Sequence, residues 1–495
     1  MTPLGALTNA LGALERANVA HCHFKSNEHL AAALAGETDL DLLVARSDAR
    51  NAEAVFAREG FKRFTSGFGT GYPGVEDWIG FDPASGRQIH LHVHYRLPVG
   101  ELHLKSWRLP FAAALLASRV RDAETGVFVA EPHHELLLLL IRRAVKLTRR
   151  ERLRARLGGG RTLGGDARRE YDWLRERTHD AGVVSLAEHE FGKEVAAAVA
   201  PLLERAPDAR GLVALRRAVL RVLAPHRAWG AFESALRQLV RGGVQRATRA
   251  LRRRGVTLPR AFRRANPSGG CVIALVGCDG AGKSTLLAEL GPWLGWKLDV
   301  LSIYFGSGDG PVSLARQPLV WVRQIQKRIR PPRPPAERSR VLKPRRLSTA
   351  RAVWALVLAH EKSRRLATAE RARQRGIVVL CDRFPQTTVR GFNDGPLLTP
   401  WLESRQAWRR RLARWELGIY ESAHRLAPDL VIKLDVSPEV AVSRKPDMAT
   451  EECARRRAAV ASLEWGERCR MLTIDAEQPL ERVIAEAKRA VWAEL

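Results

Sequence analysis

The chain lacks any hydrophobic segment long enough to cross a bilayer. Even the leucine-rich run at 136–141 is far shorter than the about 20 apolar residues that a transmembrane helix needs. The first 25 residues also lack a basic region that leads into an apolar core, so no secretory signal is expected there. These absences exclude an integral membrane protein of the helical type and favour a cytoplasmic location.

Cysteine is scarce, and its spacing excludes two common uses. No pair of cysteines is separated by two residues, as in the CxxC motif of zinc and redox sites. The scattered positions argue against both a disulfide framework and a structural zinc site, and they favour a reducing compartment. The six cysteines are Cys22, Cys271, Cys278, Cys381, Cys453 and Cys469.

Lysine is also scarce, although the chain is strongly basic. Lys and Arg together number 82 against 53 Asp and Glu, which gives a net charge of +29, and most of these cations are arginine. An arginine-rich, alanine-rich composition is typical of a GC-rich genome, so compositional drift is the first interpretation. The alternative is a functional anionic partner, because a charge this large attracts nucleic acid and acidic lipid surfaces nonspecifically. Nonspecific polyanion binding is therefore expected.

The length of 495 residues predicts several domains, and the sequence pattern changes twice along the chain. Residues 1–125 mix short apolar strands, at 39–45 and 88–97, with turns, and predict a small α/β domain. Residues 126–265 carry Leu, Ala and Arg at helical spacing and predict an all-helical connector. From 266 to 495, apolar strands alternate with helices, which predicts a doubly wound parallel sheet covered by helices on both faces. The fold class is thus multidomain α/β.

Two segments interrupt this pattern. A glycine-rich loop at 156–166 breaks the helical region, and its repeated glycines predict mobility. An insertion at 326–346 contains five prolines and many arginines, which exclude a regular helix and predict an exposed basic loop.

A phosphate-binding loop stands between an apolar strand and a helix. The segment GCDGAGKST fits GxxxxGK[ST], follows CVIALV and precedes a helical run. In such loops, glycines let backbone N–H groups surround phosphate oxygens, the lysine reaches the β- and γ-phosphates, and the hydroxyl that follows ligates magnesium. The nucleotide-binding residues predicted here are Gly277, Asp279, Gly280, Ala281, Gly282, Lys283, Ser284 and Thr285.

The carboxyl-terminal part resembles the thymidylate kinases and their nucleoside monophosphate kinase relatives. Four segments match in order: GCDGAGKSTL, the strand end Cys381-Asp382-Arg383-Phe384, PDLVIKLDVSPEVAVSRK at 428–445, and MLTIDAEQPLERVIAEA at 471–487. The resemblance covers residues 266–495. It implies a P-loop kinase fold, with ATP and Mg²⁺ as cofactors and a phosphorylated acceptor.

The resemblance also implies roles for single residues. Asp382 holds the magnesium shell together with Ser284, Arg383 grips the acceptor phosphate, and Asp279 faces the acceptor's sugar. The loop itself contains no arginine, and in such relatives a lid supplies the cation that stabilises the transferring phosphoryl group. Besides Arg444, the candidates are Lys445, Arg455, Arg456 and Arg457. Lys283, Asp382, Arg383 and Arg444 form the predicted catalytic set.

Two segments depart from the thymidylate kinase pattern. PQTTVRGFNDGPLL, at 385–398, replaces the Ser and Tyr residues that hold the thymine-side substrate. The segment at 304–319 lacks the family's Arg-Glu-Pro-Gly-Gly loop. These departures leave phosphoryl transfer in place but put the identity of the acceptor in doubt.

The amino-terminal region carries a weaker motif. GETDLDLLV at 36–44 resembles the DxD strand of nucleotidyltransferase-fold proteins, and it implies that Asp39 and Asp41 bind Mg²⁺. The turn before it reads Phe-Lys-Ser-Asn at 24–27 instead of Gly-Ser. A third carboxylate is missing from the later strand, which instead carries His90, His92 and His94. Three histidines at period two are compatible with a structural role, substrate contact or metal binding.

Three functional hypotheses follow. The leading one is an ATP- and magnesium-dependent kinase that acts on a nucleoside monophosphate, dTMP-like, or a related phosphorylated acceptor. The first alternative is a nucleotidyltransferase centred on Asp39 and Asp41, with the P-loop domain as a nucleotide sensor. The second is a nucleotide-gated binding protein without enzymatic activity. The pattern predicts no oligomeric state.

Overall fold

A computed structural model describes residues 2–67, 69–101, 103–157, 163–205, 207–253, 262–306, 349–391, 394–446 and 449–495. The basic insertion at 326–346 and the centre of the glycine-rich loop lie outside these ranges. The chain divides into two compact units, unit 1 (Met1–Val256) and unit 2 (Thr257–Leu495). No described helix is both long enough and apolar enough to span a membrane.

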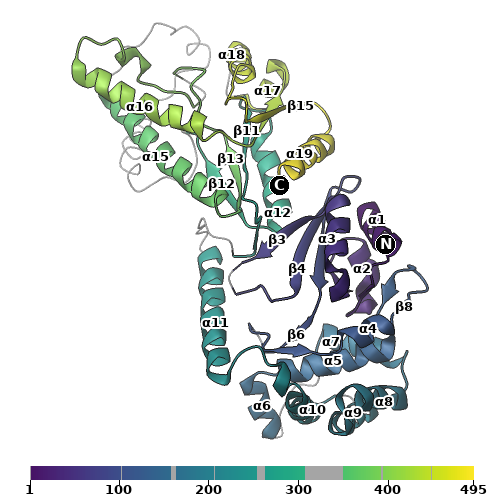
Figure 1. The fold of residues 1–495 in the computed structure, drawn as a ribbon. Coiled ribbons are helices and arrows are strands. Elements are labelled where there is room, and N and C mark those ends of the chain that lie inside the picture. Colours follow the sequence, from purple (N-terminus) through teal and green to yellow (C-terminus); the bar gives the residue numbers. More distant parts are fainter. Residues whose placement is uncertain are drawn as a thin grey trace. The chain divides into compact units, whose positions relative to one another are not determined.

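Unit 2 is built on a parallel sheet (Figure 1), with the strand order β12-β13-β11-β14-β15. The strands of unit 2 are β10 (Arg264–Ala265), β11 (Val272–Gly277), β12 (Val300–Tyr304), β13 (Val378–Asp382), β14 (Leu430–Asp435) and β15 (Arg470–Asp475). Every residue of the central strand β11 is buried. A strand buried on both faces reads as a continuous apolar run, which is how CVIALVG appears in the sequence.

Helices cover the sheet of unit 2. The helices are α12 (Lys283–Gly295), α15 (Thr349–Arg373), η4 (Thr399–Trp401), α16 (Ala407–Arg425), α17 (Pro438–Arg444), α18 (Thr450–Ala461) and α19 (Leu480–Glu494). Leu366 of α15, Ala423 of α16 and Val460 of α18 belong to one hydrophobic cluster with alternate residues of the strands. Helices α15 and α16 lie side by side in Figure 1.

Unit 1 combines a mixed sheet with a helical region. Within it the strands run in the order β3-β4-β5-β2-β1-β9-β8. The strands are β1 (His21–His23), β2 (Leu40–Val44), β3 (Lys62–Ser66), β4 (Val75–Asp82), β5 (Arg87–His94), β8 (Val120–Arg121) and β9 (Phe128–Val129), with β6 (Leu97–Val99) and β7 (Trp107–Leu109) as a separate pair. The pair β2 and β5 is parallel, and Asp41 lies opposite His92 in its register.

The helices of unit 1 fall into two groups along the chain. Those before residue 118 are α1 (Gly5–Arg16), η1 (Asn27–His29), α2 (Leu30–Leu34), η2 (Arg46–Asp48), α3 (Ala49–Arg58) and α4 (Ala112–Ala117). Those that follow are α5 (Pro132–Lys146), α6 (Arg149–Arg156), α7 (Asp166–Arg175), α8 (Asp180–Phe191), α9 (Lys193–Glu204), α10 (Ala209–Val222), η3 (Ala224–His226) and α11 (Ala231–Arg253). The second group forms the predicted helical region.

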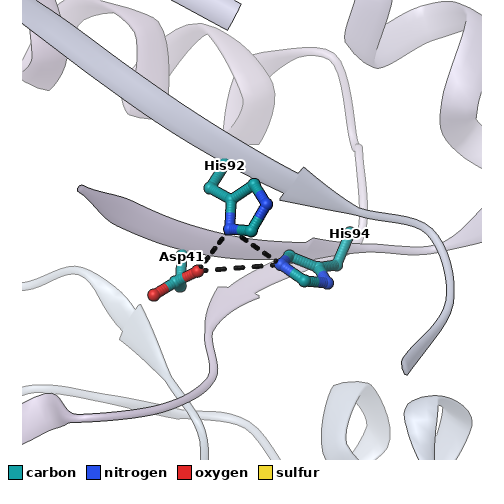
Figure 2. A group of neighbouring side chains, drawn as sticks. All are labelled: Asp41, His92 and His94. Atoms are coloured by element: carbon teal, nitrogen blue, oxygen red, sulfur yellow. Dashed lines mark hydrogen bonds and ion pairs between the residues drawn. The ribbon is translucent and has the colours of Figure 1, made fainter. Parts of the chain in front are cut away.

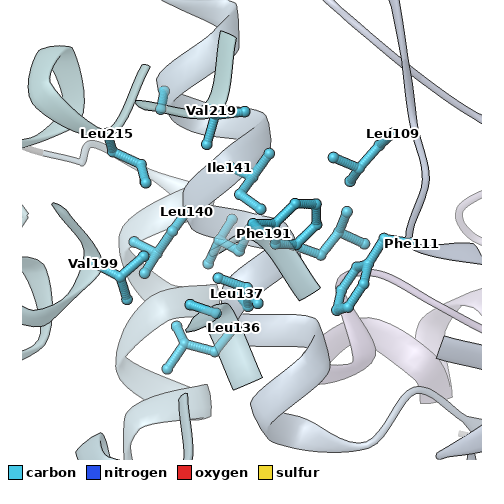
Figure 3. Packing of buried hydrophobic residues seen from close by; sticks show 14 of the residues in the cluster. Leu109, Phe111, Leu136, Leu137, Leu140, Ile141, Phe191, Val199, Leu215 and Val219 are labelled. Atoms are coloured by element: carbon cyan, nitrogen blue, oxygen red, sulfur yellow. The ribbon is translucent and has the colours of Figure 1, made fainter. Parts of the chain in front are cut away.

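The helical region and the strands of unit 1 share one core. Figure 3 shows Leu137 and Ile141 of α5 packed among residues of neighbouring elements, including Phe111 and Phe191. The same hydrophobic cluster contains Leu43 of β2. Unit 1 is therefore held together by burial of apolar side chains from both its strand and its helical segments. The multidomain α/β organisation is confirmed, whereas the division at residues 125 and 265 stays a prediction.

Candidate functional site

The loop between β11 and α12 has the backbone that a phosphate-binding loop needs. Gly280 and Gly282 have φ values of 89° and 92°, a left-handed region that favours glycine. A Cβ atom on Gly280 would lie 2.5 Å from the backbone oxygen of Ala441, so a side chain is also excluded by space. Helix α12 begins at Lys283, which places its free backbone N–H groups and positive dipole end at the loop.

Lys283 lies buried inside this loop. Its Nζ donates to the backbone oxygens of Gly277 and Cys278, at 2.9 and 2.8 Å. Burial lowers the pKa of Lys283, and the neighbouring Arg383 lowers it further. The ammonium group is thus held within the loop by carbonyl oxygens.

Asp382 ends strand β13, directly beside β11, where it lies opposite Leu275. Its Oδ1 atom is buried and has no hydrogen-bond partner among the described residues. Burial raises the pKa of Asp382, although Lys283 and Arg383 oppose the shift. An unpartnered buried carboxylate oxygen fits a cation ligand, and Mg²⁺ prefers oxygen ligands. The hydroxyl of Ser284 and Asp382 line the same cavity, so these two residues fit a magnesium site.

Asp279 lies between two arginines from different elements. The guanidinium of Arg383 donates to its Oδ1 at 2.8 Å, and that of Arg456, on α18, donates to its Oδ2 at 2.6 Å. Burial alone would raise the pKa of Asp279, but the charges of Arg383 and Lys283 lower it below its ordinary value. Asp279 therefore joins the loop to the strand end and to α18, which carries three of the five candidate lid cations.

A cavity of about 1410 Å³ opens between these elements. Its lining includes the loop from Asp279 to Thr285, together with Asp382 and Arg383. The structure thus brings most of the predicted nucleotide-binding residues to one space. Gly277 is not part of this lining and instead closes the end of β11, where a Cβ would lie 2.9 Å from the backbone oxygen of Leu434.

The five candidate lid cations separate into two groups. Arg444, Lys445 and Arg456 line the cavity, and Arg444 also donates to the backbone oxygen of Ala476 at 3.0 Å. The other two pair with carboxylates outside that lining. Arg455 contacts Glu452, and Arg457 makes two hydrogen bonds to Asp435, at 2.7 and 2.6 Å.

Three further residues of the cavity were not predicted from the sequence. Lys362, buried on α15, lies 3.2 Å from Asp394 and 5.0 Å from the centre of the Tyr420 ring. Asp394 in turn lies 3.6 Å from Arg383. Burial would lower the pKa of Lys362, but Asp394 and Tyr420 raise it above its ordinary value, so the lysine is charged. A single lysine in a helical segment gives no sequence signal that it will line a ligand cavity.

A second polar cluster lies in unit 1 on the neighbouring strands β2 and β5. Figure 2 shows Asp41, His92 and His94 converging. His92 Nδ1 is 2.9 Å from Asp41 Oδ1, and His94 Nε2 is 3.2 Å from His92 Nδ1 and 3.6 Å from Asp41 Oδ1. Burial lowers the pKa of His94 to about 3, so its ring is neutral at physiological pH. These three side chains could together hold a metal ion.

The two aspartates of the DxD motif have different surroundings. Lys25 Nζ is 2.6 Å from Asp41 Oδ1. Burial would raise the pKa of Asp41, but Lys25 and His92 hold it well below its ordinary range. Asp39 Oδ1 lies 3.0 Å from His90 Nδ1, and the other ring nitrogen of His90 lies 2.9 Å from Asp77. Asp39 thus contacts His90, whereas Asp41 contacts His92. The magnesium site predicted at Asp39 and Asp41 stays a prediction.

Comparison with known proteins finds relatives that are named as ATP-binding proteins. The chain is 31% identical over 227 residues to the Escherichia coli K12 protein described as uncharacterized ATP-binding protein YghR. The matched residues cover 44% of this chain and 86% of the relative. It is 29% identical over 237 residues to uncharacterized ATP-binding protein YghS of the same organism, 45% of this chain and 93% of the relative.

A thymidylate kinase from Leifsonia xyli is 31% identical over 230 residues, which cover 44% of this chain and 93% of that enzyme. No protein-family model matches the chain. The resemblance of the amino-terminal region to nucleotidyltransferases stays a prediction. Nearly the full length of each relative is matched, and this chain has the phosphate-binding loop in place, so it belongs to the P-loop family that includes the ATP-binding proteins YghR and YghS of E. coli.

Proposed function

We propose that unit 2 is an ATP-dependent kinase that transfers a phosphoryl group to a phosphorylated acceptor of the nucleoside monophosphate type. The observation that carries this proposal is the convergence of Lys283, Asp382 and Arg383 on one cavity of about 1410 Å³. That volume has room for a nucleotide and a second ligand, since ligand pockets commonly measure about 300–1,000 Å³. The ATP-binding relatives and the thymidylate kinase similarity support it.

The residues of the chain supply positioning and charge. The loop amides and the α12 terminus bind the phosphates of the donor, and Lys283 moves from carbonyl oxygens to phosphate oxygens. Ser284 and Asp382 would hold a magnesium ion, which would neutralise charge on the phosphates. Arg444, Lys445 and Arg456 face the same space and stabilise the charge of the transferring group.

The acceptor side is formed by charged residues from three elements. Arg383 offers a bidentate donor to an acceptor phosphate, and Asp279 holds that arginine in place. The same cavity is also lined by a polar cluster in which Lys362 contacts Asp394 and Tyr420. A pocket with buried charges selects a polar acceptor, because an apolar one would leave those groups unpaired.

An acceptor screen tests the proposal. The intact chain is incubated with Mg²⁺ and ATP labelled in either the γ- or the α-phosphate, and with nucleoside monophosphates, sugar phosphates or no acceptor. We expect transfer of the γ-label to a phosphorylated acceptor. Absence of γ-transfer to every acceptor, despite binding of ATP, would favour a non-enzymatic nucleotide-gated protein instead.

The assignment of the lid cations gives a test with a built-in control. Arg444→Ala and Arg456→Ala should each lower kcat at least about 100-fold, because each removes a cation that faces the transferring group. Arg455→Ala is the matched control, since Arg455 precedes Arg456 on α18 and shares its partner Glu452, but does not line the cavity. Equal losses in Arg455→Ala and Arg456→Ala would contradict the assignment.

Unit 1 supports a second candidate activity, nucleotidyl transfer, because Asp41 of β2 and Asp39, directly before β2, lie beside the histidine-bearing strand β5. If it is active, the intact chain releases pyrophosphate from a nucleoside triphosphate, and Asp39→Asn with Asp41→Asn abolishes the release. The γ-transfer of unit 2 should be unchanged in this double variant. Wild-type protein that releases no pyrophosphate with any nucleotide would leave unit 1 as a binding module.

A further inference from the structure

We infer that Asp41, His92 and His94 form a site for a divalent transition-metal ion of the zinc type, in unit 1 and independent of the kinase proposed for unit 2. The site differs from the magnesium site expected of a DxD motif both in its ligands and in the metal it selects. The inference rests on how the register of two strands places one carboxylate and two imidazoles.

The geometry of the three side chains matches the requirement of one shared ion. Zinc binds imidazole nitrogen and carboxylate oxygen at about 2.0–2.2 Å, so ligand atoms at angles of about 90–120° lie about 2.9–3.6 Å apart. The separations observed are 2.9 Å from Asp41 to His92, 3.2 Å from His92 to His94, and 3.6 Å from His94 to Asp41. The three ligand atoms therefore lie close enough together for one ion to contact all of them, and Figure 2 shows the three side chains converging.

The strands fix this arrangement. Asp41 and His92 are direct partners in the parallel register of β2 and β5, and His94 lies two residues further along β5, on the same face. Side chains on rigid strands need little reordering to bind an ion, which favours affinity. The third histidine of the motif is excluded, because His90 is buried between Asp39 and Asp77.

The ligand types decide the metal. Two imidazoles and one carboxylate suit zinc, cobalt, nickel or iron, whereas magnesium takes an all-oxygen shell. Three protein ligands also leave a fourth position open to water or a substrate, as in catalytic rather than structural zinc sites. The class of ligand that fits this position is a small anionic or oxygen-bearing group.

Lys25 is the competitor of the ion. Its ammonium lies 2.6 Å from the Asp41 oxygen that would bind the metal and balances that charge in the metal-free protein. A metal ion must displace this ammonium, so Lys25 lowers the affinity of the site. Replacing it with an uncharged side chain of similar length should tighten metal binding.

The experiment is a metal titration of the intact chain, stripped of metal by a chelator and free of nucleotide. Cobalt(II) serves as the spectroscopic probe and zinc as its competitor. We expect one equivalent of Co²⁺ to bind, with visible absorption bands of a nitrogen- and oxygen-ligated ion, and Zn²⁺ to displace it. A large excess of Mg²⁺ should not displace it, because magnesium binds imidazole poorly.

Variants locate the site. His92→Ala and His94→Ala should weaken binding by more than the about 10- to 100-fold typical of a lost outer-shell partner. His179→Ala is the control, because it removes a histidine from another histidine pair of unit 1, with His133 at 3.0 Å. Asp382→Asn is a second control, which tests whether Co²⁺ binds instead at the candidate magnesium site of unit 2. Both controls should bind Co²⁺ as the wild type does. Lys25→Met should bind Co²⁺ more tightly than the wild type, because no ammonium then competes with the ion for Asp41.

Three outcomes would overturn the inference. They are the absence of Co²⁺ and Zn²⁺ binding by both the wild type and Lys25→Met, binding that persists in His92→Ala, and binding that is lost equally in His179→Ala. Thermal unfolding of each variant checks that it is folded. If His92→Ala fails to fold, His92→Gln, which keeps a polar side chain at this half-buried position, replaces it in the titration.

Discussion

Lys283→Ala is expected to abolish phosphoryl transfer, with a loss in kcat of at least about 1,000-fold. The removed ammonium lies inside the phosphate-binding loop, where it donates to the backbone oxygens of Gly277 and Cys278, and in the proposed kinase it is the cation that meets the β- and γ-phosphates. The measurement is steady-state transfer of the γ-label to the acceptor identified by the screen.

The fold should survive this change. The Lys283 side chain faces a ligand cavity, and burial of its charge carries a desolvation cost that the variant removes. Lys297→Ala, which alters a lysine stacked near Trp296, is the matched control and should retain activity. Undiminished turnover in Lys283→Ala would refute the kinase proposal for unit 2.

Asp382→Asn is expected to lower activity and raise stability at the same time. Asparagine keeps the shape of the side chain but removes the negative charge that would hold magnesium, so kcat should fall by about 100- to 1,000-fold. In the metal-free protein the buried Oδ1 atom has no hydrogen-bond partner among the described residues, so loss of its charge should stabilise the fold by about 1 kcal/mol. Activity and thermal unfolding of one preparation test both effects.

The pH dependence provides a second readout for Asp382. Because burial raises its pKa, the folded protein holds the proton more tightly than an ordinary aspartate does. The ionised form, which the proposed magnesium site requires, is therefore lost at a higher pH as the solution is acidified, and the acid limb of kcat/KM should lie above the range of a solvated aspartate. This limb should disappear in Asp382→Asn.

A matched control separates a ligand role from a general charge effect. Asp475 ends β15 at the same edge of the sheet as Asp382, and its side chain is exposed and outside the cavity lining. Asp475→Asn should leave both kcat and the acid limb unchanged. Similar losses in both variants would show that Asp382 acts through overall charge and would remove it from the magnesium site.

The sequence by itself determined the elements whose signals are local. A strand buried on both faces must be apolar along its whole length, so CVIALV marked β11, and the glycines and lysine after it marked the loop and the start of α12 at Lys283. The strand that ends at Asp382 was predicted for the same reason. In unit 1, short apolar runs at 39–45 and 88–97 indicated β2 and β5, but β4 was not predicted, although it pairs along the whole of β5.

Only the tertiary structure decided which of several similar side chains meet. Arg455, Arg456 and Arg457 are consecutive, and only the phase of α18 turns Arg456 toward Asp279 while Arg457 binds Asp435. Lys362 lies far along the chain from Tyr420 and Asp394, yet helix packing brings them together. Likewise, the parallel register of β2 and β5 places Asp41 beside His92, whereas Asp39 contacts His90. Contacts of this kind depend on packing between distant segments, which no local pattern encodes.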